Sequence, residues 1–229
     1  MAIILSLETS ASICAVALHD KGVLLASAEL HIEQSHASKL ASLIRDVTAV
    51  AAVDMKNLQA LAVSSGPGSY TGLRIGTATA KGLCYALNIP LIAVNTLEVM
   101  ARQMVGVNVY QALLCPMIDA RRMEVYCMVV DAALQPVQPV EAKIVDEHSF
   151  LDLLDNHQVL FFGSGAEKCR SVITHDNARF INNIHPSVIT LGVMASEKLE
   201  KNEIAELIAF EPYYLKEFTV KKPVTAEPH

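Results

Sequence analysis

The sequence predicts an α/β protein made of two duplicated lobes, each with a mixed sheet flanked by helices. A short apolar strand that ends on a carboxylate opens each half of the 229-residue chain, at residues 3–8 and again at 112–119. A polar turn and a returning apolar strand follow in both halves, and a repeat of about a hundred residues indicates a duplicated unit. We expect lobes at 1–105 and 106–229, and it stays open whether the end of the chain packs back on the first lobe.

The first half begins as an antiparallel meander and continues as a helix. Residues 3–7 are apolar throughout, as in a strand buried on both faces, and apolar segments at 13–18 and 23–28 follow after short polar turns. Strands joined by such short turns pair antiparallel. Apolar residues then recur at helical spacing over residues 35–53, which predicts a long helix.

A glycine-rich turn between a strand and a helix is the most informative feature of the chain. The apolar strand at 61–65 runs through the turn GPGSYTG into a helix that is predicted to extend to residue 87. The backbone N–H groups of a first helical turn have no partner within the helix, so such a turn can hold an anion or receive another backbone. Gly66, Gly68 and Gly72 can equally form a structural turn with at least one glycine at positive φ. The absence of a P-loop ending favours that alternative.

The second half repeats this order of elements. Strands are predicted at 112–118 and 124–130, and a third strand, at 159–162, runs into a turn that contains Gly163 and Gly165. The pattern of a strand that enters a helix through glycines therefore occurs once in each half. Shorter helices are expected at 96–104, 148–156, 167–174 and 192–201.

Composition argues for a reduced protein without a basic nucleic-acid footprint. Five cysteines, an odd number with no C-x-x-C pair, predict buried thiols and argue against a disulfide framework or a structural zinc site. The net charge is −6 and no basic run exceeds two residues, which argues against a protein that grips nucleic acid by itself. No apolar stretch approaches the ~18 residues of a membrane helix, and the first residues lack a basic leader, so we expect a cytoplasmic protein with no membrane partner.

Three segments carry a resemblance to a known family. They are residues 7–10 (LETS), residues 64–76 (SSGPGSYTGLRIG) and residues 118–126 (IDARRMEVY), in this order along the chain. Together they resemble the bacterial TsaB (YeaZ) family, in the glycoprotease-like, TsaD-related branch of the actin-like ATPase superfamily. Residues 211–216 (EPYYLK) are similar to the closing segment of that family. The resemblance implies the actin-like (ASKHA, ribonuclease H-like) fold.

The resemblance also implies a role in tRNA modification. Members of this family are non-catalytic partner subunits of TsaD, the transferase that forms N6-threonylcarbamoyladenosine next to the anticodon of ANN-decoding tRNAs. It implies a heterodimer with a TsaD homologue, the ATPase TsaE in a larger complex, a homodimer when alone, tRNA contact only through the complex, and no cofactor. An active actin-like ATPase or phosphotransferase is the alternative, and a protease is a third option that no catalytic constellation supports.

A TsaD-type metal site would need two histidines at H-x-x-x-H on a helix, because residues four apart share one helical face. His36 is present at the matching position, but Leu40 takes the place of its partner. His31 lies five residues before His36, outside that spacing. We therefore expect no metal site, and a capping or surface role for His36.

The nucleotide site is predicted to be degenerate. The turn of the second lobe has Arg121 and Arg122 where kinases have a small, flexible phosphate loop, and two bulky cations there would narrow the cleft between the lobes. The enzymatic alternative needs an acidic magnesium site, for which Glu8 and Asp119 are the candidates. The resemblance places the phosphate and adenosine contacts at Glu8, Thr9, Ser10, Asp119, Gly163 and Gly165.

A stripe of small residues is the candidate partner interface. Along the helix that follows the glycine turn, a small residue recurs every fourth position, which allows another backbone to approach closely. The neighbouring helix is rich in alanine and poor in charge, so the two helices together can leave an apolar surface for a partner. The alternative is that the stripe packs on its own sheet. The predicted interface residues are His36, Leu40, Leu43, Val47, Gly72, Gly76, Ala80 and Cys84.

Overall fold

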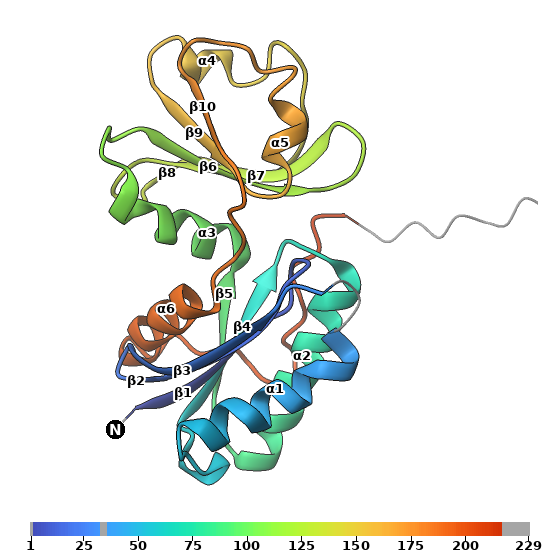
Figure 1. Cartoon of the computed structure of the whole chain (residues 1–229), viewed down its shortest axis with the longest axis vertical. Helices are drawn as coiled ribbons and strands as arrows, with labels where there is room; N and C mark the ends of the chain where they lie inside the picture. The colour runs from blue at the N-terminus through green and yellow to red at the C-terminus, as the bar shows by residue number, and fades with distance from the viewer. Residues whose placement is uncertain (1, 33–35, 217–229) are drawn as a thin grey trace, which may run out of the picture.

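The computed structural model describes residues 2–32 and 36–216, and for His36 it describes the backbone alone. The chain forms two lobes, each built on a five-stranded sheet (Figure 1). The strands of the first sheet lie within residues 3–95 and those of the second within residues 113–181. Within the described part of the chain, no helix is long and apolar enough to cross a lipid bilayer.

The first sheet joins an antiparallel meander to a parallel pair of strands. Strands β1 (Ile3–Glu8), β2 (Cys14–Asp20) and β3 (Val23–Leu30) pair antiparallel, as the short turns between them require. Strand β4 (Ala60–Gly66) runs parallel to β1, and β5 (Leu91–Asn95) runs parallel to β4, which gives the order β3-β2-β1-β4-β5. Every residue of β1 is buried because both faces of the sheet are covered.

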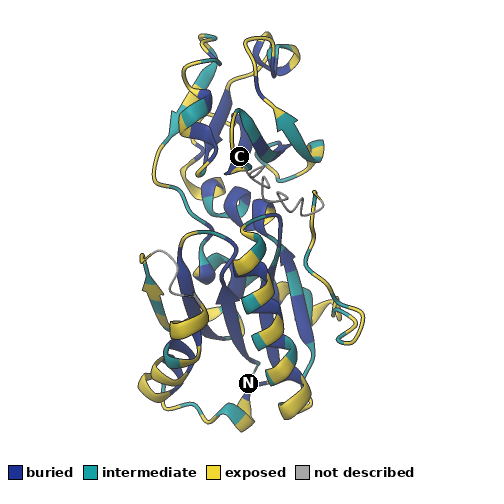
Figure 2. Cartoon of the chain, turned by 90° about the vertical axis from the view of Figure 1, so that its right-hand side faces the viewer, coloured by how far each residue is buried: buried dark blue, intermediate teal, exposed yellow. Residues whose placement is uncertain are grey.

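Helices cover both faces of the first sheet. Helices α1 (His36–Val50) and α2 (Tyr70–Leu87) lie on one face, and the short helix η1 (Met55–Asn57) leads from α1 toward β4. Helix α6 (Val188–Glu200), near the other end of the chain, covers the opposite face (Figure 1). Figure 2 shows buried strands behind helices whose outer faces are exposed, the arrangement that removes one apolar stripe of each helix from water.

The second sheet has the same topology. Strands β6 (Leu113–Asp119), β7 (Glu124–Val130) and β8 (Pro136–Ile144) form an antiparallel meander. Strand β9 (Val159–Phe162) runs parallel to β6 and β10 (Ala178–Ile181) runs parallel to β9, which gives the order β10-β9-β6-β7-β8. The strand order and directions repeat those of the first sheet, so the predicted duplication is confirmed.

The second sheet is also covered on both faces. Helix α3 (Thr96–Met104), followed by η2 (Val105–Val107), packs on the face that is turned toward the first lobe (Figure 1). The short helices α4 (Leu151–Leu154) and α5 (Ala166–Cys169) lie on the other face. All five cysteines are free and buried, as the sequence predicts.

Three strands, β5, β8 and β10, escaped prediction from the sequence. β8 begins at Pro136 and contains Pro139, and these residues are tolerated because β8 is an edge strand whose outward N–H groups need no partner in the sheet. The helices expected at 148–156 and 167–174 are single turns in the structure. The helix expected at 192–201 begins four residues earlier, at Val188, where Ser187 caps it.

The expected boundary at residue 105 falls at the end of α3, which lies between the two lobes. Leu97, Met100 and Met104 of this helix pack with the second sheet, and Val99 packs with the first. After α6 the chain runs along the first lobe as a closing strap, defined here as residues 201–216, and its last residue reaches the second lobe. Within it, the N–H of Ala205 donates to the carbonyl oxygen of Leu91 at 2.8 Å, and the N–H of Tyr213 donates to that of Ser65 at 2.7 Å.

A buried histidine lies between β2 and α6. His19 is completely buried, and within the described residues neither ring nitrogen makes a hydrogen bond of good geometry, although the backbone of Ile189 interacts with the ring and favours its charged form. Helix α6 approaches it at Gly192, where a Cβ atom would lie closer than 3.0 Å to the imidazole ring. Burial lowers the pKa of His19 below its usual value, because the charged form cannot be solvated. The folded chain therefore holds this imidazole neutral.

We expect His19 to make the free energy of unfolding fall on acidification. Below about pH 6.5 the unfolded chain binds a proton at this histidine that the folded chain rejects, which costs up to about 1.4 kcal/mol per pH unit. In His19→Leu this contribution is absent, so stability should fall less steeply between about pH 7.5 and pH 5. Urea denaturation of both proteins over this range measures the difference, and parallel pH profiles would contradict it.

Candidate functional site

A cleft of about 960 Å³ lies between the two lobes. Its walls come from the segments that follow β1, β4, β6 and β9, from residues 184–186 and from the end of the closing strap. Segments that follow parallel strands gather at one edge of a sheet, where α/β proteins bind their ligands. The cleft is therefore where the predicted site residues have to be placed.

Glu8 is turned into the first lobe and is completely buried. The backbone N–H and the hydroxyl of Ser10 donate to its Oε1 at 2.7 and 2.5 Å, and the hydroxyl of Ser64 donates to its Oε2. Burial raises the pKa of Glu8, and the hydrogen bonds from Ser10 and Ser64 oppose that rise. The carboxyl group thus ties the end of β1 to β4, inside the lobe.

The turn after β1 packs against the glycine-rich turn after β4. The hydroxyl of Thr9 donates to the carbonyl oxygen of Gly72 at 2.8 Å. The backbone N–H of Ser69 donates to the carbonyl oxygen of Ser10 at 2.7 Å. A backbone N–H of the glycine turn that could meet an anion therefore meets a carbonyl oxygen of the same chain.

Glycines of this turn and of the first two turns of α2 make that approach sterically possible. Cβ atoms at three positions would lie closer than 3.0 Å to atoms of Thr9 or Ser10. Gly66 has φ +111°, which favours glycine and confirms the predicted positive φ in this turn. The structural alternative thus accounts for the glycines without a bound anion. The three positions are Gly68, Gly72 and Gly76.

Asp119 lines the cleft, and a cation lies beside it. The ammonium group of Lys168, on α5, donates to its Oδ1 and to the carbonyl oxygen of Glu124. The N–H of Arg121 donates to the same Oδ1 at 2.9 Å, and the N–H of Asp119 donates to the hydroxyl of Ser164 at 3.2 Å. The carboxylate is compensated by charge and organises the turn between β6 and β7.

Gly163 and Gly165 allow the turn after β9 to pack on β6 and β7. Gly163 has φ +102°, and a Cβ there would lie closer than 3.0 Å to the carbonyl oxygen of Met117. A Cβ on Gly165 would come within the same distance of Val125. A second cavity of about 220 Å³ adjoins Gly163 and residues 182–185. Both glycines have a packing role that requires no nucleotide.

The histidines do not assemble into a metal centre in the described part of the chain. Over residues 2–32 and 36–216, no group of three His, Cys, Asp or Glu side chains could hold a metal ion. Nε2 of His31 lies 3.4 Å from Oε2 of Glu29, and the His31 ring stands edge-on to the ring of His185 at 6.4 Å. The side chain of His36 lies outside the described residues. The expectation that metal has no role stays a prediction.

Seven of the eight predicted interface residues are buried within the first lobe, so their assignment to an exposed surface is wrong. The side chains of α1 pack in the core on the sheet, and the small-residue stripe of α2 lies against β4 and the turn after β1. The alternative, packing on the lobe's own sheet, explains the stripe. The seven residues are Leu40, Leu43, Val47, Gly72, Gly76, Ala80 and Cys84; the side chain of the eighth, His36, is not described.

One part of the cleft escaped prediction, because its residues are far apart in sequence. The closing strap enters the cleft at Tyr214, whose ring centroid lies 5.1 Å from that of Tyr70 at the start of α2. Two residues later the ammonium group of Lys216 pairs with the carboxylate of Glu124 in the second lobe. The resemblance of residues 211–216 to a family segment was the one sequence signal for this contact, and it did not indicate where this segment lies in the fold.

Comparison with known proteins shows the family to which the chain belongs. The family model for tRNA N6-adenosine threonylcarbamoyltransferase (TsaD) matches residues 29–226. The TsaB protein of Haemophilus influenzae, named for tRNA threonylcarbamoyladenosine biosynthesis, is 28% identical over 230 residues, 96% of this chain and 96% of that protein. TsaB of Escherichia coli is 36% identical over 123 residues, which cover 54% of this chain and 52% of that protein.

Solved structures agree with the topology. YeaZ from Pseudomonas aeruginosa superposes with a TM-score of 0.81 at 26% identity, over 94% of this chain and 100% of that one. A proposed N-acetylmannosamine kinase from Listeria monocytogenes has a TM-score of 0.51 at 8% identity, over 87% of this chain and 99% of that one, which speaks for the fold alone. The predicted actin-like α/β fold is confirmed.

We expect Gly72→Ala to destabilise the chain, because the new Cβ would press on the carbonyl oxygen of Thr9. The cost should be about 1–3 kcal/mol, as for other overpacked sites. Gly82→Ala, in the same helix, is the matched control: nothing lies within 4 Å of its Cβ. It should be neutral or stabilise by up to ~1 kcal/mol through helix propensity. Urea denaturation compares the two, and equal midpoints would contradict the packing described here.

Proposed function

Because this chain belongs to the tRNA N6-adenosine threonylcarbamoyltransferase family, with TsaB (YeaZ) proteins as its full-length relatives, we propose that it is the non-catalytic partner subunit of a TsaD transferase. In this role it supports the formation of N6-threonylcarbamoyladenosine next to the anticodon of ANN-decoding tRNAs. TsaD carries out the transfer, TsaE joins as the ATPase of a larger complex, and the chain alone forms a homodimer in the cytoplasm.

The proposal of a non-catalytic subunit rests on the hydrogen bonds and the ion pair that engage the polar groups around the cleft. Glu8 is enclosed by serine hydroxyls, and Asp119 is paired with Lys168. The glycine turn and the start of α2 form hydrogen bonds with Thr9 and Ser10 of the same chain. Groups that an actin-like enzyme would turn toward magnesium or phosphate are thus used to hold each lobe together. This favours a partner subunit over the alternative, an active ATPase or phosphotransferase.

The outer face of α1 and α2 is the surface that we propose for docking on TsaD. Small and apolar side chains are exposed there beside the charged Arg45 and Arg74, and Val50 and Tyr85 are 83% and 84% exposed. Small residues on two adjacent helices allow the helices of a partner to approach closely. This face, called the α1–α2 outer face below, includes Ala41, Ala49, Val50, Ala78, Gly82 and Tyr85.

A reconstituted modification reaction tests the proposed function. The chain, the TsaD homologue, TsaE, unmodified tRNA and a source of threonylcarbamoyl-AMP should together form the modified nucleoside, and omission of the chain should abolish its formation. Calorimetric titration of the isolated chain with Mg-ATP should give weak or absent binding. Tight binding with ATP turnover by the chain alone would support the enzymatic alternative and contradict the proposal.

We expect Ala78→Arg to weaken TsaD binding at least tenfold without unfolding the chain. Ala78 is exposed on α2, so an arginine is tolerated in the monomer, whereas in a close-packed interface it buries a charge without a partner. Ala133→Arg, at an exposed position in the turn between β7 and β8, is the matched control and should bind TsaD normally. Surface plasmon resonance measures both, with circular dichroism for folding. Equal affinities for the two variants would remove α2 from the interface.

A further inference from the structure

The turn between β6 and β7 holds two neighbouring arginines in a strained conformation. Arg121 has φ +71° and Arg122 has φ +49°, a region that residues with a side chain rarely adopt and that favours glycine or asparagine. The turn is fixed by hydrogen bonds from the N–H of Ala120 to the carbonyl oxygen of Glu124 at 3.0 Å and from the N–H of Glu124 to that of Arg121 at 3.1 Å. Eight other residues with side chains have positive φ elsewhere in the described chain, so this conformation only shapes the turn, and a site here depends on the two arginine side chains.

Both arginines present uncompensated positive charge. Each is exposed, and among the described residues neither guanidinium group has a carboxylate within ion-pair distance. The acids of the same turn are engaged elsewhere: Asp119 pairs with Lys168, and Glu124 pairs with Lys216. On a chain of net charge −6, this turn is therefore a local concentration of free cations beside the cleft.

Aromatic rings lie on the first-lobe wall of the same cleft. Tyr70 and Tyr214 line it together with Arg121. The guanidinium carbon of Arg74 lies 5.4 Å from the centre of the Tyr70 ring, and its Nη1 donates to the Tyr70 hydroxyl at 3.1 Å. Tyr214 is 39% exposed. Cations on both lobes, the exposed ring of Tyr214 and the half-buried ring of Tyr70 thus surround one opening.

We propose that the Arg121–Arg122 turn binds the phosphate backbone of the tRNA, with the Tyr70–Tyr214 pair beside an unpaired base. Planar guanidinium groups bind phosphate oxygens in pairs, and two adjacent arginines supply two phosphate contacts. Exposed aromatic rings next to cations are typical of surfaces that bind single-stranded nucleic acid, which favours RNA over an acidic protein segment. This inference rests on the proposed function, which brings tRNA to the complex; the net negative charge confines the contact to that complex.

A salt series on the tRNA affinity of the complex of the full chain with the TsaD homologue tests the inference. In Arg121→Asn/Arg122→Asn the charges are removed, while asparagine accepts the left-handed backbone. Each phosphate contact adds about 0.7–0.9 to the slope of log K against log salt, so the slope should become shallower by about 1.4–1.8. Affinity at low salt should fall at least tenfold. Tyr214→Leu should lower affinity about tenfold with the slope unchanged, because stacking is not ionic.

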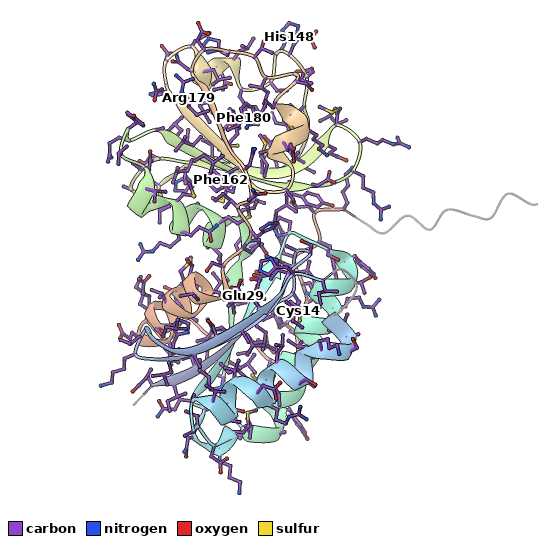
Figure 3. All side chains as sticks on the ribbon, viewed as in Figure 1. Cys14, Glu29, His148, Phe162, Arg179 and Phe180 are labelled. Atoms are coloured by element: carbon purple, nitrogen blue, oxygen red, sulfur yellow. The ribbon has the colours of Figure 1, made fainter. Side chains whose placement is uncertain are left out.

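The matched control removes two charges from another side of the same lobe. Arg179 lies on the edge strand β10, in the upper part of the second lobe in Figure 3, and the guanidinium carbon of Arg170 lies 5.1 Å from the centre of the neighbouring Phe180 ring. Arg170→Asn/Arg179→Asn should keep the parental slope. Binding of TsaD by every variant is measured in parallel, so that an intact complex is present in each salt series.

Each outcome decides the inference. An unchanged slope in Arg121→Asn/Arg122→Asn, with normal TsaD binding, overturns the tRNA contact and leaves the proposed function intact. Loss of TsaD binding in this variant alone would assign the turn to a protein interface and also overturn the contact. Failure of the unaltered chain to support modification, with the slope difference still present, would count against the proposed function and not against the phosphate contact.

Discussion

The packing of residues 8–10 against the glycine turn is the contact on which the first lobe depends. It joins the end of β1 to the start of α2, so it fixes the angle at which α2 leaves the sheet. It also encloses Glu8, whose burial is tolerated because Ser10 and Ser64 satisfy the carboxyl oxygens. The same contact forms part of the first-lobe wall of the cleft and determines which face of α2 is buried in the lobe. Gly72 and Gly76 are small because Thr9 lies against them.

The second lobe repeats the topology with different chemistry at the equivalent place. Where the first lobe buries a carboxyl group among hydroxyls, the second keeps Asp119 at the surface and neutralises it with Lys168. The hydrogen bonds of the buried Glu8 carboxyl are shielded from solvent. An ion pair at the surface is instead screened by salt and contributes little to stability. The first-lobe turn is thus a rigid part of the core, and the second-lobe turn is available for contacts outside the chain.

The sequence predicted the fold well where the signal is local. The apolar runs gave most strands, and the glycine turn gave α2, but β8 was missed because Pro136 opens an edge strand on which proline costs no sheet hydrogen bond. The site was predicted less well. Small residues at regular spacing predict a close contact with a helix but do not identify the contacting segment. At Gly72 that segment contains Thr9, which lies 63 positions earlier in the chain. The pair of Lys216 and Glu124 spans 92 positions, and no periodicity reports a contact at that separation.

The place of α6 in the chain has a consequence for biosynthesis. The first sheet is translated before the second, yet the helix that covers its face around Ile4, Ile92 and Val94 is formed from residues 188–200. The strands and helices of the second lobe are contiguous, so that lobe can finish folding on the ribosome while the first still exposes an apolar face. The first lobe is therefore completed only when α6 has been synthesised. A chain truncated before α6 would therefore have a first lobe with one face of its sheet uncovered, and this exposed apolar face would favour aggregation.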